Sequence, residues 1–355
     1  MQAHIWTTTA CNLRCKYCYE HKKDNTYMTE IIAKKACKFI IQKHISNNDG
    51  SRLIIQIHGG EPLLNYNIIK VICNYFNQYF DRDNTKYGIR MTTNLSNVTD
   101  SMIDYIATNI EHISISIDGD KYTHDMNRQF DNGSGSFNIV SKNTKKLLKI
   151  KPLTWARMTI TSDSANRLYE NVTYLYDMGF RCISSAIDEF DQNWCDEKYN
   201  LLLREIKKCA DFLYKKQCDN EYLYIGIVES ALKLKKRGVC SAGRQSINID
   251  PTGKIFACTQ AVGIDDYCIG DIYTDVDQMK VNQIIKLSEC KNIDCEGCAN
   301  YDYCPGTQCK IINKLMTNDY NKPCMATCFN QNIRLRAADY YRNLQKLSEK
   351  DSMYV

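Results

Sequence analysis

Short apolar segments and amphipathic segments alternate along the first part of the chain, and this alternation restricts the fold more than any other feature. Six β-branched or aromatic runs, each bounded by polar or glycine-containing turns, predict strands at His4–Thr8, Leu53–Ile57, Gly88–Thr92, His112–Ile117, Trp155–Ile160 and Arg181–Ile187. Helical periodicity predicts helices between them at Thr29–His44, Tyr66–Phe80, Ser101–Ala107, Phe137–Leu148, Asn166–Met178 and Asp196–Lys216. Such alternation is typical of parallel strands joined by right-handed crossovers, and six units are too few for a closed eight-stranded barrel. The sequence therefore predicts an α/β fold, a partial (β/α)6 TIM-like barrel, with Thr29 and Ser136 as helix N-caps.

The sequence changes character after about residue 236, where helical periodicity fades and cysteines become frequent. A last amphipathic helix is expected at about Asn332–Leu347. We therefore predict a barrel at 1–225, a linker at 226–239, a cysteine-rich domain at 240–331 and a C-terminal helix and tail at 332–355.

Charge and hydropathy indicate a cytoplasmic protein. The 46 basic and 41 acidic residues are interleaved, so nucleic acid is not indicated as a partner. No secretory leader and no run of apolar residues long enough to cross a membrane is present, so no membrane partner is expected. Because cytoplasmic thiols are kept reduced, 19 cysteines point to metal or redox chemistry rather than to disulfides.

Three cysteines, Cys11, Cys15 and Cys18, fall on one short loop directly after the first predicted strand. Three thiolates can hold a cubane [4Fe–4S] cluster and leave the fourth iron open for a substrate or cosubstrate. The alternative is a zinc site with a distant fourth ligand, but zinc-binding cysteine pairs are usually two residues apart. The spacing favours the iron–sulfur interpretation.

With Tyr17 before the last cysteine, the trio resembles the signature of the radical S-adenosylmethionine (AdoMet) superfamily. His58-Gly59-Gly60-Glu61-Pro62 is similar to that family's GGE motif, which implies that its backbone and Glu61 receive the AdoMet amino group. The resemblance extends to later strand ends and implies that AdoMet is bound by Tyr17, Gly59, Gly60, Glu61, Thr93, Asn94, Ser116, Asp118 and Arg157. Arg157 is expected to pair with the AdoMet carboxylate.

The resemblance also implies a mechanism. A reduced cluster cleaves AdoMet to methionine and a 5′-deoxyadenosyl radical, which abstracts a hydrogen atom from the substrate. An electron donor such as flavodoxin or ferredoxin is implied as a partner.

The C-terminal cysteines resemble the SPASM extension, which carries two auxiliary [4Fe–4S] clusters in enzymes that modify peptides or protein side chains. The resemblance implies one cluster held by Cys240, Cys258 and Cys309 and another held by Cys295, Cys298, Cys304 and Cys328. The spacing before Cys309 departs from the family pattern, and the fourth ligand of the first cluster is Cys268, Cys290, Cys324 or an open position. The alternative is a pair of structural zinc sites. Most of the remaining cysteines are interpreted as small buried side chains, the whole set being Cys37, Cys73, Cys182, Cys195, Cys209 and Cys218.

Within this resemblance, Cys240-Ser-Ala-Gly and the segment from Asn321 to Cys328 look like the maturases that form thioether crosslinks in ribosomally made peptides. We expect a peptide or protein maturase that forms an intramolecular thioether or carbon–carbon crosslink. The alternatives are oxidation of cysteine or serine to formylglycine, as in anaerobic sulfatase maturases, and epimerisation.

The barrel is predicted to begin by His4, so no leader-peptide recognition domain precedes it in this sequence. Three alternatives follow: a separate protein presents the precursor peptide, the barrel binds it unaided, or the enzyme is instead similar to the anaerobic sulfatase maturases, which also lack that domain. Asp118, Asp188 and Glu189 lie near predicted strand ends, but the sequence assigns no catalytic acid or base. A non-enzymatic alternative is an iron–sulfur carrier or a zinc-stabilised binding module.

Overall fold

The structure is a computed structural model that describes the backbone of residues 1–20, 23–47, 50–80 and 86–352 and the side chains up to residue 346 within those ranges. The chain forms two compact units, each assembled from separated segments. The first contains Met1–Ile115, Gln129–Ser134 and Val239–Cys290, and the second contains Ser116–Arg128, Gly135–Gly238 and Lys291–Val355.

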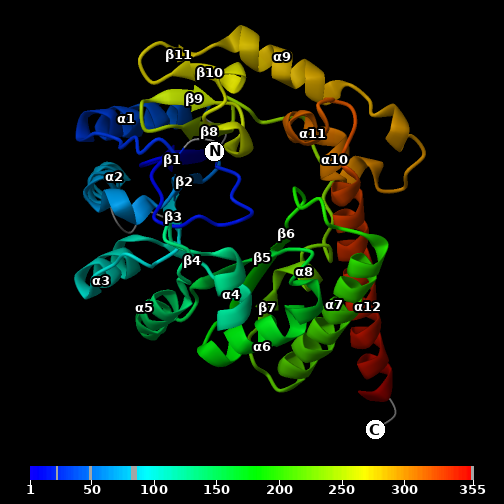
Figure 1. The fold of residues 1–355 in the computed structure, drawn as a ribbon. Coiled ribbons are helices and arrows are strands. Elements are labelled where there is room, and N and C mark those ends of the chain that lie inside the picture. The colour runs from blue at the N-terminus through cyan, green and yellow to red at the C-terminus, as the bar shows by residue number, and fades with distance from the viewer. Residues whose placement is uncertain (21–22, 48–49, 81–85, 353–355) are drawn as a thin grey trace. The chain divides into compact units, whose positions relative to one another are not determined.

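Parallel strands and covering helices form the N-terminal part of the first unit. The strands β1 (Gln2–Trp6), β2 (Leu53–His58), β3 (Tyr87–Thr93) and β4 (His112–Ser116) pair in this order. The helices α1 (Glu30–Asn47), α2 (Tyr66–Phe80) and α3 (Asp100–Asn109) lie on one side of these strands, as Figure 1 shows. The helix-facing side chains, such as Ile5, Ile55 and Ile57, are fully buried. This apolar layer holds the carboxyl ends of the strands in fixed positions.

A C-terminal segment extends the same sheet. Strand β8 (Ser246–Ile249) pairs parallel to β1, and β9 (Lys254–Phe256), β10 (Cys268–Asp271) and β11 (Asp275–Val276) follow in antiparallel order. Helix α9 (Gln278–Glu289) ends this segment. The sequence did not predict these strands or this helix, because the strands are short and the helical periodicity is weak.

The second unit repeats the strand–helix pattern. Its parallel strands are β5 (Trp155–Ile160), β6 (Cys182–Ile187) and β7 (Tyr224–Ile225). Its helices up to residue 229 are α4 (Lys121–Asn127), α5 (Phe137–Ile150), α6 (Leu168–Met178), α7 (Asp196–Cys218) and α8 (Gly226–Glu229). Beyond residue 290 come α10 (Pro305–Gln308), α11 (Lys310–Thr317) and α12 (Met325–Ser352). Helix α12 packs along α7 (Figure 1).

The predicted α/β fold is confirmed: each predicted strand overlaps one of β1 to β6, and each predicted helix overlaps an observed one. Thr29 accepts a hydrogen bond from the Ile32 N–H at 3.4 Å, as expected of an N-cap. Ser136 is the N-cap residue of α5, as predicted, but its hydroxyl donates to the Arg128 carbonyl at 2.8 Å and makes no cap hydrogen bond. The last helix begins at Met325, earlier than predicted.

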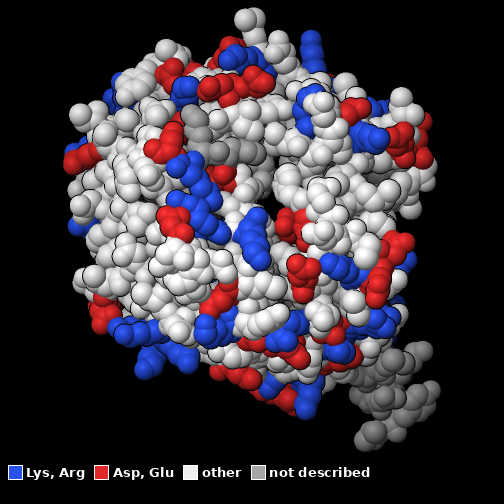
Figure 2. All heavy atoms as spheres, in the orientation of Figure 1, with Lys and Arg blue, Asp and Glu red and all other residues white. Residues whose placement is uncertain are grey.

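Surface charge agrees with the composition. On the face shown in Figure 2, basic and acidic side chains are mixed rather than gathered by sign. Within the described part of the chain, no helix combines the length and the apolar content that crossing a membrane requires.

Candidate active site

The first cysteine loop follows β1 in the first unit. Cys11 and Cys15 are half-buried, and Cys18 is exposed. The Cys18 N–H donates to the Cys15 carbonyl at 3.2 Å, and the Leu13 N–H donates to the Cys11 Sγ at 3.4 Å. Burial, with smaller contributions from the nearby Glu61, Cys15 and Cys18, raises the pKa of the Cys11 thiol to about 12. The Cys11 thiolate is therefore disfavoured unless a cation lies beside it. Tyr17, within the same loop, is half-buried.

Two glycines after β2 lie directly against the chain that leads into this loop. A Cβ on Gly59 would come within 2.5 Å of the Thr8 carbonyl oxygen, and one on Gly60 within 2.4 Å of the Ala10 carbonyl oxygen. Gly59 also has a φ of +145°, which other residues rarely adopt. The Gly60 and Glu61 N–H groups donate to the Thr8 and Ala10 carbonyls at 3.0 and 2.8 Å. The glycine pair thus lets the loop after β2 pack onto the backbone that carries Cys11.

Glu61 joins the ends of β2 and β3. Its Oε1 accepts hydrogen bonds from the Thr93 hydroxyl at 2.6 Å and the Leu63 N–H at 3.0 Å. Its Oε2 accepts one from the Asn94 N–H at 2.7 Å. Burial raises the pKa of the Glu61 carboxyl to about 7, although these hydrogen bonds favour the charged form. The structure therefore brings Glu61, Thr93 and Asn94 together as one buried clamp beside the cysteine loop.

Two residues that the sequence analysis missed complete this clamp. The Asn94 side-chain amide donates to the Asn12 Oδ1 at 3.0 Å, and the Asn12 amide donates to the Ser96 hydroxyl at 2.8 Å. Asn12 lies between Cys11 and Cys15, so this chain of amides fixes the loop from inside. The position of Asn12 within the motif was the only sequence signal that could have indicated this role.

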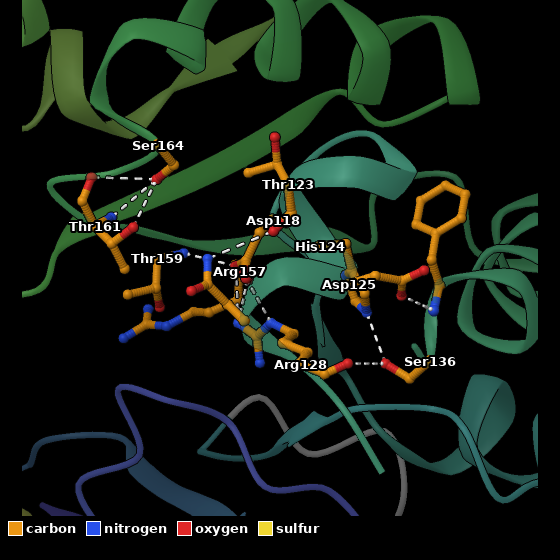
Figure 3. Close-up of polar contacts among 12 residues, drawn as sticks. Asp118, Thr123, His124, Asp125, Arg128, Ser136, Arg157, Thr159, Thr161 and Ser164 are labelled. Atoms are coloured by element: carbon orange, nitrogen blue, oxygen red, sulfur yellow. Dashed lines mark hydrogen bonds and ion pairs between the residues drawn. The ribbon is translucent and has the colours of Figure 1, made fainter. Parts of the chain in front are cut away.

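In the second unit, the buried Asp118 carboxylate forms an ion pair with the Arg128 guanidinium (Figure 3). The Arg128 Nε and Nη2 each donate to it at 3.0 Å, and the Thr159 N–H donates at 2.9 Å. The Ile117 N–H donates to the Arg157 carbonyl at 3.1 Å, so the segment after β4 is pinned to β5. The Arg157 guanidinium is exposed and extends away from the ion pair (Figure 3). Arg128 was not recognised from the sequence.

Figure 3 also shows what supports Arg128. Its carbonyl accepts from the Ser136 hydroxyl, which lies 2.9 Å from the His124 Nε2. Ser116, at the end of β4, is half-buried. Asp118 accepts three hydrogen bonds, from Arg128 and the Thr159 N–H, so its side chain orients the surrounding backbone. Arg157 is exposed and presents an accessible guanidinium.

Four C-terminal cysteines also lie near one another within the second unit. Burial raises the pKa of the Cys295 thiol, and the nearby Cys304, Cys298 and Cys328 raise it further. Burial likewise raises the pKa of Cys304, while N–H groups of the following turn donate to its sulfur and oppose the rise. The four thiols predicted to form one ligand set therefore share one neighbourhood.

The helix that carries Cys328 is anchored by a carboxylate after β6. Glu189 Oε2 accepts from the Thr327 hydroxyl at 2.7 Å, and Glu189 Oε1 accepts from the Asn330 side-chain amide. Both donors lie on α12, on either side of Cys328 in the sequence. Glu189 thus fixes the first turns of this helix.

The cysteines proposed for the other auxiliary site divide between the two units. Cys240 and Cys258 are half-buried in the first unit, and Cys309 is half-buried in the second. Cys268 packs against the apolar cluster of Trp6, Phe256 and Val262. The other candidate fourth ligands differ in exposure, Cys290 being exposed and Cys324 half-buried.

The interpretation of most remaining cysteines as buried side chains is confirmed. Cys37, Cys73, Cys182 and Cys209 are buried, whereas Cys195 and Cys218 are exposed. None of the 19 cysteines of the chain forms a disulfide.

The residues of the first loop fit an iron–sulfur cluster. Cys11, Cys15 and Cys18 lie on one loop and form no disulfide, and the Leu13 N–H is directed at the Cys11 sulfur. A cubane cluster takes its thiolate ligands on different iron atoms, so three cysteines on one loop suit ligation that leaves the fourth iron open.

Comparison with known families gives one match that covers half the chain. The profile described as "Radical SAM superfamily" matches residues 5–187. A cysteine-type anaerobic sulfatase-maturating enzyme of Clostridium novyi is 23% identical over 316 residues, covering 83% of each chain. A radical SAM cyclopropyl synthase, TigE, of Paramaledivibacter caminithermalis is 26% identical over 345 residues, covering 87% of this chain and 67% of TigE.

Solved structures with the same fold include peptide-bound enzymes. The structure titled "Native anSMEcpe with bound AdoMet and Cp18Cys peptide" matches with a TM-score of 0.77 at 19% identity, covering 98% of this chain and 99% of the other. Streptococcus suis SuiB bound to precursor peptide SuiA matches with a TM-score of 0.67 at 15% identity, covering 92% and 75%. At these identities the likeness establishes the fold alone.

Proposed function

Because this chain belongs to the radical SAM superfamily, as its cysteine and GGE motifs predicted, we propose that it is a maturase of ribosomally made peptides or of proteins. When bound, a [4Fe–4S] cluster with AdoMet supplies the radical chemistry that removes a hydrogen atom from the substrate. The observation that carries the proposal is the loop that presents Cys11, Cys15 and Cys18 together, none of them in a disulfide, and that is pinned by the loops after β2 and β3.

The residues around that loop have assignable roles. Cys11, Cys15 and Cys18 hold the cluster. The Gly60 and Glu61 N–H groups already donate to the Thr8 and Ala10 carbonyls. The loop of Gly59 and Gly60 therefore has carbonyl oxygens, rather than N–H groups, to offer to the AdoMet ammonium group. Thr93, Asn94 and the Leu63 N–H donate to Glu61 and hold it in place, which leaves about one acceptor position of the carboxylate for the cofactor.

In the second unit, Arg157 and Ser116 are the proposed contacts for the AdoMet carboxylate. The Arg157 guanidinium is exposed, so it can form a bidentate pair. Asp118 acts through Arg128 and the Thr159 N–H by fixing the backbone that carries Arg157. Tyr17 lies within the cysteine loop and is proposed to line the cofactor site.

We assign the auxiliary clusters as the sequence indicated. Cys295, Cys298, Cys304 and Cys328 hold one cluster, and their shared neighbourhood in the second unit supports this assignment. Cys240, Cys258 and Cys309 hold the other, with a fourth ligand from Cys268, Cys290 or Cys324, or an open position. Auxiliary clusters can accept the electrons that a crosslinking or oxidising reaction releases.

Crosslinking by a thioether or carbon–carbon bond is the proposed reaction. Similarity to sulfatase-maturating enzymes over 83% of the chain makes oxidation of cysteine or serine to formylglycine the second candidate. A cytoplasmic location, an electron donor such as flavodoxin or ferredoxin, and a separate leader-binding protein belong to the same proposal.

The first test is formation of 5′-deoxyadenosine. Anaerobically reconstituted protein given AdoMet and dithionite should produce it, and Cys15→Ala should abolish production because the cluster loses a ligand. Cys218→Ser changes an exposed cysteine outside the proposed ligands and should retain production. If wild-type protein with iron and sulfide in place makes none, or if the loop binds zinc instead, the protein is a cluster carrier or a zinc module.

The second test is the mass of a peptide encoded beside the gene, or of a cysteine-containing sulfatase peptide, after incubation. Loss of a pair of hydrogens without an aldehyde indicates a crosslink, and formylglycine indicates the second candidate. An unchanged mass with inverted stereochemistry indicates epimerisation.

A further inference from the structure

One row of polar side chains crosses the first unit's sheet on the face opposite its helices. Strand register places five residues side by side on β8, β1, β2, β3 and β4, namely Asn248, His4, Gln56, Arg90 and His112. Residues paired in register on parallel strands point to the same face, and neighbouring strands are about 5 Å apart. The row is therefore a continuous polar strip.

This composition is unusual for parallel strands, whose two faces are normally both apolar. The alternate positions obey that rule, since Ile5, Ile57 and Met91 are buried under the helices. His4 and Arg90, on the opposite face, are half-buried. The polar row is therefore partly accessible at these two residues.

Three atoms of the row are buried without a hydrogen-bond partner: the His4 Nδ1, the Arg90 Nε and the Asn248 Oδ1. Asn248 is completely buried, and its amide nitrogen is fixed by donation to the Phe256 carbonyl at 2.9 Å, which directs the unpartnered oxygen. Buried polar groups are nearly always satisfied, so three in one row indicate a missing polar partner.

The row contains one fixed cation. Among the described residues, no carboxylate forms an ion pair with Arg90. Burial lowers the pKa of His4 to about 4, so His4 is neutral near pH 7 and adds no charge. A single half-buried guanidinium favours a monoanion that accepts from it bidentately, and a carboxylate has this geometry.

We propose that Arg90, with Gln56, His4 and Asn248 beside it, binds a carboxylate group of the substrate. The identity of that group as part of a peptide rests on the function proposed above. Arg90 lies three residues before Thr93 on β3, which is about 10 Å along the strand. Thr93 is one of the residues proposed above to line the AdoMet site. About three residues of extended peptide cover this distance. The substrate carboxylate bound by Arg90 is therefore expected a few residues away from the substrate side chain that reacts.

Acetate is the probe for this site. Its binding to reconstituted full-length protein with AdoMet is followed by saturation transfer to the methyl protons, with acetamide as the neutral control. Wild-type protein should bind acetate saturably, and Arg90→Gln should weaken binding about ten- to hundredfold. Arg90→Lys should recover part of the affinity. Arg204→Gln removes an equal charge from the exposed surface of α7 and should change nothing.

Gln56→Glu is the sharpest variant, because it supplies an internal carboxylate in register with Arg90. It should abolish acetate binding and raise the midpoint of thermal unfolding, since Arg90 gains a partner. A purely structural Arg90 predicts no acetate binding in any form of the protein. This variant also keeps the test decisive if Arg90→Gln does not fold.

Two probe pairs identify the source of the carboxylate. If N-acetylalanine displaces acetate and its amide does not, the site binds a peptide C-terminus. If N-acetylaspartamide displaces acetate and N-acetylasparaginamide does not, the site binds an acidic side chain. The acid of at least one pair should displace acetate. The proposal is overturned if wild-type protein binds no acetate saturably, or if Arg90→Gln and Gln56→Glu bind it as wild type does. Failure to make 5′-deoxyadenosine is measured separately and overturns the proposed function without altering the binding result.

Discussion

The two described groups of cysteines are held in different ways. The loop of Cys11, Cys15 and Cys18 is pinned by backbone contacts, since Gly59 and Gly60 leave no room for a side chain against it. The group of Cys295, Cys298, Cys304 and Cys328 is carried by short turns and the first turns of α12, which side-chain hydrogen bonds to Glu189 hold. Backbone contacts tolerate almost no change, whereas side-chain hydrogen bonds can be weakened one at a time. The comparison predicts abrupt losses at the first group and graded losses at the second.

The largest effect is expected for Gly60→Ala. The new Cβ would lie 2.4 Å from the Ala10 carbonyl oxygen, so the chain before Cys11 must shift. We expect loss of 5′-deoxyadenosine formation together with the iron of the first loop, while the C-terminal iron remains. Gly238→Ala, where an added Cβ meets no atom within 4 Å, is the matched control. Full activity of Gly60→Ala would show that this loop is not fixed by backbone contact.

Cys304→Ala should produce the next largest change. It removes one thiol from the C-terminal group, so the iron content should fall by one cluster and peptide modification should stop. 5′-Deoxyadenosine formation should persist far above that of Cys15→Ala, because the first loop is separate in the chain. Cys195→Ala, at an exposed cysteine outside both groups, should keep its full iron content. Unchanged iron in Cys304→Ala contradicts the assignment of this ligand set.

Local patterns predicted the barrel strands because each is a short segment with β-branched or aromatic residues between turns, as in Trp155–Ile160, which is observed with the same bounds. Strands β9 and β11 span three and two residues, which is too short for an alternation of apolar and polar residues to be recognised. Ser136 was assigned as a cap because hydroxyl residues favour that position, but the nearby Arg128 carbonyl takes its hydroxyl instead.

The candidate site was predictable where a motif fixes spacing and not where a contact depends on tertiary structure. Cys11, Glu61 and Asn94 were chosen from motifs, and the structure brings Glu61 and Asn94 together. Asn12 and Arg128 were missed because their partners lie in the loops after β3 and β4, 82 and 10 residues away in the sequence. No local periodicity reports such pairs.

Glu189→Gln tests the side-chain anchoring of α12. A glutamine nitrogen would face one of the two donors, Thr327 or Asn330, and leave it without an acceptor. We expect a loss of about 1–3 kcal/mol in the free energy of unfolding and a partial loss of C-terminal iron. Chemical denaturation and iron analysis measure the two quantities. Glu197→Gln, an exposed position in the first turn of α7, should change neither. An unaltered iron content would mean that Cys328 is held without Glu189.

The smallest expected effect is that of Ser96→Ala, and it tests whether the first loop also contains a graded element. The Ser96 hydroxyl accepts from the Asn12 amide at 2.8 Å and donates to the Asn94 Oδ1 at 2.7 Å, and both contacts would be lost. Since Asn94 still holds Asn12 by a second hydrogen bond, we expect a loss of about 1 kcal/mol in the free energy of unfolding, with the cluster retained. Ser241→Ala, at an exposed serine, is the control for the denaturation measurement. Loss of the cluster in Ser96→Ala would show that the amide chain, and not the glycine contact, holds the loop.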